Sequence, residues 1–250
     1  MRLNKLAATL MATALLGIGS SAQAVILTDI VWIIDTSGSM GDDITQVKNN
    51  IVSFNTAMTT AGIDAQYGLV RFGGTASLIQ DITTFSDFNR AGGPFVTLTA
   101  SGGSTEDGSA AIQAAMAATF RPDSVRNFIL VTDENDDVST NRAALNTDLS
   151  NTALSELINI IGNPGDDDSN YYRDLAPANG GAFFNILDFR STPEAFFTAF
   201  TATKVRETVQ NFCDLNPNDP QCQNTVPEPQ TLALLGLGLL GLGLTRRRKA

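Results

Sequence analysis

The sequence predicts an α/β fold with a doubly wound, mostly parallel central sheet and helices on both faces. Short apolar runs, such as Ile26–Asp35 and 127–133, are bounded by polar residues and are typical of buried strands. They alternate with segments of helical periodicity, which favours parallel strands covered on both sides. Both runs end in an aspartate, at the strand ends where sheets of this kind bind ligands.

The first half of the chain contains one long amphipathic segment between predicted strands. Asp42 or Asp43 can cap a helix that ends near Gly62. Apolar residues in this helix recur every three or four positions and form one stripe suited to packing on a sheet: Ile44, Val47, Ile51, Phe54 and Met58. After it we expect a strand at 66–72, an antiparallel strand at 77–82 and a loop with a turn of helix at 85–93.

The second half continues the alternation of strands and helices. Pro193 is placed to occupy the first turn of the last helix. The predicted elements are a helix at 106–120, a strand at 127–133, a polar loop at 134–140, a helix at 141–151, strands at 157–161 and 180–189, and a helix at 193–212.

Residues 1–24 have the pattern of a secretory signal peptide. Arg2 and Lys5 precede a short apolar run, 6–18, and Ala22-Gln23-Ala24 provides a small-x-small cleavage site. An uncleaved membrane anchor is the alternative. Residues 25–212 are then the predicted domain.

The C-terminal segment carries a second export feature. Val226-Pro227-Glu228-Pro229 precedes an apolar run at 232–244, and four basic residues follow it. Segment 226–250 therefore resembles the PEP-CTERM sorting signal of Gram-negative bacteria, which an exosortase processes. The run is shorter than the roughly 20 residues that span a bilayer, which favours a transient inner-membrane anchor. The resemblance implies final delivery to the cell surface or extracellular matrix; a lasting C-terminal anchor is the alternative.

The charge of the domain excludes one class of partner. Residues 25–225 keep 25 of the 26 acidic residues but only 10 of the 16 basic ones, a net charge near −15. Nucleic acid is therefore not an expected partner, because binding it requires a basic surface. An acidic domain instead attracts divalent cations.

The two cysteines, Cys213 and Cys222, lie in the predicted linker 213–225. In an exported protein we expect them to pair with each other, with free thiols or an intermolecular bridge as the alternatives. A zinc site is not expected, because two cysteines without any histidine leave the tetrahedral ligand set incomplete.

A candidate metal site follows the first apolar run. Asp35, Ser37 and Ser39 alternate along a loop, so that their oxygens can converge on one point. One carboxylate and two hydroxyls suit a hard cation such as Mg²⁺. Helix capping combined with a polar turn is the alternative interpretation of this segment.

This Asp-x-Ser-x-Ser pattern resembles the metal-ion-dependent adhesion site of von Willebrand factor type A domains. The family site also needs a threonine in a glycine-rich loop and an aspartate after a later strand, and Thr105 and Asp133 match them. The resemblance covers residues 26 to 212 and implies the family's Rossmann-like fold. It implies that Ser37, Ser39 and Thr105 ligate the ion, while Asp35 and Asp133 ligate it or orient its waters. We expect the ion to be Mg²⁺; Mn²⁺ and Ca²⁺ are the alternatives, because hard oxygen sites overlap.

The resemblance implies an exported adhesion module rather than an enzyme. Its ion would bind an acidic group, such as a carboxylate, on an extracellular protein or matrix component. Histidine-based catalysis is excluded because the chain has no histidine. There are two alternatives: a structural matrix protein whose metal only stabilises the fold, and a Mg²⁺-dependent hydrolase. The acidic stretches 133–137 and 166–168 lack the glycine and glutamate of calcium loops and are predicted to be solvated.

Overall fold

The computed structural model of the chain describes residues 25–151 and 156–223. Its core is a six-stranded sheet with the order β3-β2-β1-β4-β5-β6, in which only β3 pairs antiparallel. The predicted doubly wound α/β fold is thereby confirmed. The strands are β1 (Ile26–Asp35), β2 (Ile63–Phe72), β3 (Ser77–Thr83), β4 (Val125–Val131), β5 (Glu156–Gly162) and β6 (Phe183–Asn185).

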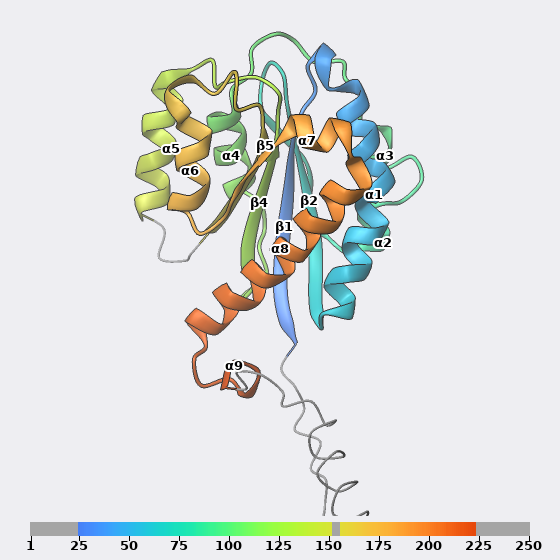
Figure 1. Cartoon of the computed structure of the whole chain (residues 1–250), viewed down its shortest axis with the longest axis vertical. Helices are drawn as coiled ribbons and strands as arrows, with labels where there is room; N and C mark the ends of the chain where they lie inside the picture. Colours follow the sequence, from blue (N-terminus) through green and yellow to red (C-terminus); the bar gives the residue numbers. More distant parts are fainter. Residues whose placement is uncertain (1–24, 152–155, 224–250) are drawn as a thin grey trace, which may run out of the picture.

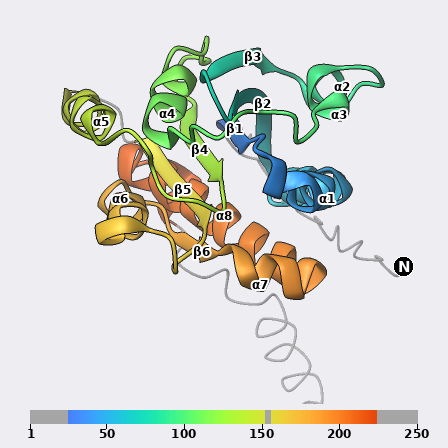
Figure 2. The same cartoon turned by 90° about the horizontal axis from the view of Figure 1, so that it is seen from above.

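Helices cover both faces of the sheet (Figures 1 and 2). One face carries α1 (Gly41–Thr60), α7 (Ile186–Ser191) and α8 (Pro193–Leu215). The other carries α4 (Gly108–Met116), α5 (Ser139–Asn151) and α6 (Tyr171–Ala178). Short helices complete the described chain: η1 (Gly38–Met40), α2 (Phe85–Phe88), α3 (Pro94–Thr97), η2 (Asp168–Asn170) and α9 (Pro220–Gln223).

Alternation along β1 explains why both faces are covered. Trp32 and Ile34 pack into the apolar cluster under α1 and α8, whereas Val31 and Ile33 pack into the cluster under α4 and α6. Successive strand side chains point to opposite faces, so a strand that is apolar throughout requires a layer on each side. The two apolar cores hold the carboxyl end of β1 in a fixed position.

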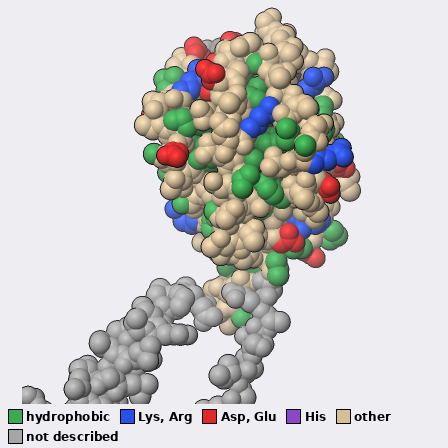
Figure 3. All heavy atoms as spheres, turned by 90° about the vertical axis from the view of Figure 1, so that its right-hand side faces the viewer, with side chains coloured by type: hydrophobic (Ala, Val, Ile, Leu, Met, Phe, Trp, Pro, Cys, Tyr) green, Lys and Arg blue, Asp and Glu red, His purple; other side chains and the backbone are tan. Residues whose placement is uncertain are grey.

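The long helix α1 packs as its apolar stripe predicts. All five stripe residues are buried, and Phe54 stacks on Phe200 of α8 at a ring-centroid distance of 5.9 Å. Trp32 of β1 meets Phe54 edge to face at 5.5 Å. Figure 3 views the side on which α1 lies and shows hydrophobic side chains among polar ones. A shallow groove between α1 and α8 borders the C-terminal half of α1, around Thr56 and Ala202.

The structure differs from the predicted elements most clearly at two predicted elements and one additional helix. The strand predicted at 180–189 ends at Asn185, because the Asn185 side chain accepts a hydrogen bond from Leu187 N and starts α7. The helix predicted at 106–120 spans only Gly108–Met116; it begins at Gly108 because Asp107 caps it through Ala110 N at 2.9 Å. Helix α6 was not predicted; it has only eight residues, and one of them is Pro177, a residue that disfavours a helix interior.

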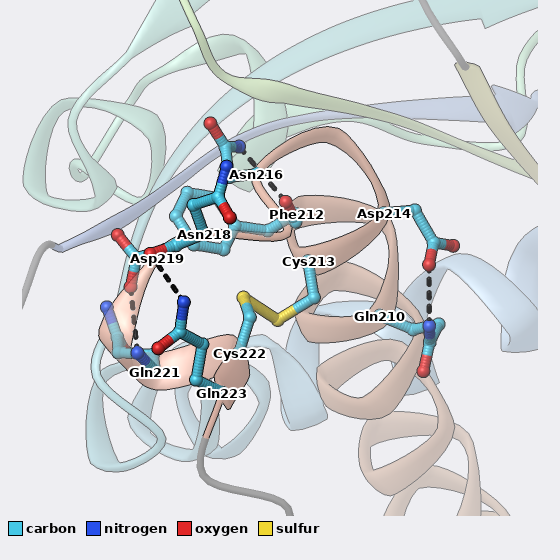
Figure 4. Close-up of a disulfide and its surroundings, with 10 residues drawn as sticks. All are labelled: Gln210, Phe212, Cys213, Asp214, Asn216, Asn218, Asp219, Gln221, Cys222 and Gln223. Atoms are coloured by element: carbon cyan, nitrogen blue, oxygen red, sulfur yellow. Dashed lines mark hydrogen bonds between the residues drawn. A yellow bond between two sulfur atoms is a disulfide. The ribbon is translucent and has the colours of Figure 1, made fainter.

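The predicted disulfide between Cys213 and Cys222 is present, with an S–S distance of 2.06 Å (Figure 4). It ties the end of α8 to α9. Within the turn that it closes, the Asp219 carboxylate accepts from Gln221 N at 2.9 Å and the Phe212 carbonyl accepts from the Asn216 side chain at 3.0 Å.

The predicted signal peptide and the apolar run at 232–244 lie outside the described residues. Among the residues that are described, none of the helices combines the length and the apolar character needed to cross a membrane. The transient anchor therefore stays a prediction from the sequence.

Candidate metal centre

The predicted site residues come from two neighbouring strands and the loops that follow them. Asp35 is the last residue of β1, and Asp133 lies two residues beyond the end of β4. Strands β1 and β4 pair in parallel, with Ile34 opposite Val131, so their carboxyl ends lie side by side. Both aspartates are more than nine-tenths buried. The sheet register thus brings together two acids that are almost a hundred residues apart.

Asp35 is fixed by hydrogen bonds at both of its oxygens. Its Oδ1 accepts from Ser37 N at 2.8 Å, and its Oδ2 accepts from Thr132 Oγ1 at 2.9 Å. The side chain is fully buried, and this burial raises the pKa of Asp35 despite the hydrogen bonds that oppose the shift. A positive charge next to this carboxylate would therefore be favourable.

Two predicted hydroxyl ligands lie in the same cluster. Ser39 Oγ donates to Asp133 Oδ1 at 3.0 Å, and the Ser37 and Ser39 hydroxyl oxygens are 3.2 Å apart. Ser37, just before η1, and Ser39, within it, therefore place their hydroxyls side by side, next to Asp133. Four of the five residues predicted to hold the ion are connected by these contacts.

Thr105 differs from the other four. Its side chain is exposed, and its backbone carbonyl accepts from Gly74 N at 2.7 Å. No hydrogen bond joins its hydroxyl to the other predicted ligands in the part of the chain that is described. Its loop is nevertheless held against the site, because Gly102 N donates to Thr36 O at 2.6 Å. A Cβ at Gly102 would lie 2.6 Å from Gly73 O, so only glycine fits there.

The sequence interpretation missed Glu106, which is 2% exposed. Ligand oxygens of Asp35, Glu106 and Asp133 all lie within 4.8 Å of one another. Burial, followed by the negative charge of Asp35, raises the pKa of Glu106 to about 8. Its position directly after Thr105 was the available signal, but that segment was interpreted as the start of a helix.

The sequence interpretation also missed Arg190, which comes from α7. Its Nη2 is 2.8 Å from Asp133 Oδ2 and 2.5 Å from Asp43 Oδ2, and both carboxylates hold the pKa of the guanidinium above its usual range. A residue so distant in the chain carries no local signal of this role. Arg190 neutralises the side of Asp133 that faces α1.

The acidic loop after β4 is structural, contrary to the predicted solvated loop. Asp136 is 3% exposed and accepts from Ser109 N at 3.0 Å, which fixes the first turn of α4. Asp167, in the second acidic stretch, is also buried and accepts from Tyr172 N at 2.9 Å at the start of α6. The prediction was wrong for these two acids because each accepts a hydrogen bond from a backbone N–H in the first turn of a helix.

The cluster fits a hard divalent cation. Carboxylate and hydroxyl oxygens are the ligands that Mg²⁺ and Ca²⁺ prefer. One carboxylate oxygen, Glu106 Oε2, is buried and has no hydrogen-bond partner among the described residues. Burial and the charges of Asp133 and Asp35 also raise the pKa of the adjacent Glu134. The residues present thus form a cation-attracting edge of the sheet.

A family profile described as the von Willebrand factor type A domain matches residues 29–198, and a PEP-CTERM protein-sorting motif matches residues 225–249. No curated protein matches the chain.

Solved structures share the fold at low sequence identity. A von Willebrand factor type A structure from Catenulispora acidiphila matches with a TM-score of 0.53 and 19% identity over 73% of this chain and 43% of that one. BatB from Bacteroides thetaiotaomicron matches with a TM-score of 0.53 and 14% identity, over 72% of this chain and 98% of that one. Proximal thread matrix protein 1 from the mussel byssus, with a zinc-occupied MIDAS motif, matches with a TM-score of 0.55 and 15% identity. The match covers 73% of this chain and 47% of that one. The chain therefore matches less than half of two of these three structures.

Proposed function

The chain belongs to the von Willebrand factor type A domain family, and we propose that its domain is an exported binding module that uses a divalent ion to hold an acidic group of a partner. The observation that carries the proposal is the convergence of Asp35, Ser37, Ser39 and Asp133 at one edge of the sheet. Thr105, in the adjoining loop, completes the proposed ligand set.

The chemistry of this ligand set supports binding. Ser37, Ser39 and Thr105 would supply neutral hydroxyls, while Asp35 and Asp133 would supply charge or orient bound water. Mg²⁺ retains waters readily, and a carboxylate from a protein or matrix component can replace one of them. Mg²⁺ is the proposed ion; Mn²⁺ and Ca²⁺ use similar oxygen ligands, and the byssus protein shows that a related fold accepts zinc in its MIDAS motif.

The sorting motif supports the proposed location. A PEP-CTERM motif implies export and processing by an exosortase in a Gram-negative bacterium. We propose cleavage of residues 1–24, a binding domain at 25–212, a linker closed by the disulfide at 213–225, and a sorting segment at 226–250. The apolar run 232–244 would hold the chain at the inner membrane until the domain reaches the surface or matrix.

The test is metal-dependent retention of the mature chain. The purified protein is applied to immobilised cell-surface and matrix material of the producing bacterium, with Mg²⁺ or with EDTA. We expect retention in Mg²⁺ only, and loss of retention in Asp35→Ala. Asp123→Asn is the control, because Asp123 is exposed and its φ of 61° suits asparagine. Equal retention in Mg²⁺ and EDTA would contradict the proposal.

A structural role for the ion is the second candidate, and Glu106 favours it. A third carboxylate compensates more of the charge of a bound ion, so the ion would bind a partner less strongly. In that case Asp35→Ala lowers the melting temperature of the Mg²⁺-loaded protein while retention on the matrix is unchanged. Turnover of a phosphate ester in Mg²⁺ would instead indicate a hydrolase.

A further inference from the structure

We propose that Glu106 is an additional metal ligand, and that it acts as an internal carboxylate which competes with the acidic group of the partner. The inference rests on the proposed function, since it requires an ion at the site. It concerns a residue that lies outside the Asp-x-Ser-x-Ser, threonine and aspartate pattern.

The burial of Glu106 is the first observation. Its side chain is 2% exposed, and its Oε2 has no hydrogen-bond partner among the described residues. A buried carboxylate oxygen without a partner is costly, so it is rarely kept without a function. The carboxylate lies within 4.8 Å of ligand oxygens of Asp35 and Asp133, and a cation shared by the three acids would remove this cost.

The second observation is that the backbone fixes this placement. Glu106 N donates to Asp137 Oδ2 at 2.8 Å, and Glu106 O accepts from Asp137 N at 3.0 Å. The next residue, Asp107, caps α4 through Ala110 N and accepts from Asn141 Nδ2 at 2.5 Å. Because both flanks of Glu106 are anchored, its side chain is directed into the cluster rather than toward solvent.

The third observation is the lack of a compensating protein cation. Arg190 pairs with Asp133 and Asp43, and no ion pair within residues 25–151 and 156–223 includes Asp35 or Glu106. The other buried aspartate of β1, Asp29, does have its own arginine at 2.7 Å. A cation from solution is therefore the natural partner of Asp35 and Glu106.

If Glu106 ligates the ion, it changes both the affinity of the site for the ion and the affinity of the ion for a partner. A third carboxylate strengthens the attraction for a divalent ion, but it compensates charge that would otherwise attract the carboxylate of a partner. Glu106 therefore makes the ion site tighter and the partner site weaker. The partner must displace Glu106 from the ion, or bind beside it.

The test compares Mg²⁺ binding by isothermal titration calorimetry in the mature chain and in Glu106→Gln. We expect the variant to bind Mg²⁺ at least tenfold more weakly. Glu194→Gln is the matched control, because it removes the same charge from an exposed side chain at the start of α8, outside the cluster, and we expect less than a threefold change. Glu106→Asp keeps the charge, so it should bind Mg²⁺ more tightly than Glu106→Gln does.

Partner binding gives the second readout. At saturating Mg²⁺, Glu106→Gln should be retained on the matrix material at least as strongly as the unaltered chain. Equal Mg²⁺ affinity in Glu106→Gln and the unaltered chain would overturn the role of Glu106 and leave the proposed function standing. Absence of Mg²⁺ binding in the unaltered chain would overturn both. Weaker retention of Glu106→Gln at saturating Mg²⁺ would overturn the proposed competition between Glu106 and the acidic group of the partner.

Discussion

Strand β1 carries a buried aspartate near each of its ends, and the two are stabilised differently. Asp29, near the start, is fully buried beside Arg121. Asp35, at the end, is equally buried but lies beside Glu106 and Asp133. Both belong to the same strand and the same sheet, so the difference comes only from what the neighbouring loops supply.

Near the start of β1, the protein itself supplies every hydrogen bond and the counter-charge of Asp29. Asp29 accepts from Arg121 Nε at 2.7 Å, from Arg121 N at 2.6 Å and from Ser124 Oγ at 2.9 Å. The same guanidinium donates to Thr28 O at 2.8 Å. Both carboxylate oxygens thus have partners and the charge is neutralised, which is what a buried carboxylate in a structural role requires.

At the end of β1, the described residues supply hydrogen bonds to Asp35 but no counter-charge. Its hydrogen bonds come from Ser37 N and Thr132 Oγ1, which carry no charge, and its nearest charged neighbours are acids. The described part of the fold neutralises Asp29 with its own arginine but supplies no cation to Asp35, which is where we propose that an external ion binds. Burial alone therefore does not distinguish the two aspartates; the presence or absence of a neighbouring arginine does.

Removal of Arg121 should have the strongest effect on stability. Arg121→Met leaves the Asp29 carboxylate buried and unpaired, so the free energy of unfolding should fall by about 3–5 kcal/mol. Urea denaturation followed by the fluorescence of Trp32 measures it. The control Arg71→Met removes an exposed arginine and should change stability by less than about 0.5 kcal/mol. Similar effects of both variants would contradict the structural role of the Asp29 pair.

Addition of metal should stabilise the protein through the Asp35 end alone. Mg²⁺ at a hundred times its dissociation constant should add about 2.7 kcal/mol to the free energy of unfolding. Thermal unfolding with Mg²⁺ or EDTA measures the gain. Asp35→Asn should abolish it, whereas Arg121→Met should keep it despite its lower baseline. A Mg²⁺ response that survives in Asp35→Asn would place the ion elsewhere.

The chelated protein should lose stability as the pH rises. The pKa of Glu106 is raised from 4.5 to about 8 in the folded state, so the folded protein keeps a proton that the unfolded chain has released. The stabilisation is complete below pH 4.5 and is lost as the pH rises through 8. We expect a fall of about 2 kcal/mol, less than the full shift implies, because the site borders solvent. Urea midpoints in EDTA measure this slope, and a slope that persists in Glu106→Gln would contradict the assignment.

A matched pair of serine variants should give the smallest effects. Ser124→Ala removes a hydrogen bond to Asp29 and should cost about 1 kcal/mol of stability. Ser39→Ala removes the hydrogen bond from an exposed hydroxyl to Asp133, so the chelated protein should change less. In Mg²⁺ titrations we expect the opposite order: Ser39→Ala should lower the affinity for Mg²⁺, and Ser124→Ala should leave that affinity unchanged. The same order in both measurements would argue against a ligand role for Ser39.

Much of the architecture was predictable from local patterns. The apolar runs of β1 and β4, the stripe of α1 and the position of each strand end follow from periodicity and chain order. Local periodicity predicts these features because each depends on residues close together in the chain. The convergence of Asp133 with Asp35 depends on the parallel pairing of β1 with β4. The resemblance to the family predicted this convergence, and periodicity did not.

Contacts between distant loops decide the rest. Whether Thr105 or Glu106 points into the cluster depends on Asp137, which fixes the Glu106 backbone from more than thirty residues away. Arg190 reaches Asp133 only because β6 ends early and α7 begins at its edge. The direction of a loop side chain has no periodicity to reveal it. The sequence therefore specifies which edge of the sheet holds the acids, and the packed loops determine how many of them share it and which remain without a cation.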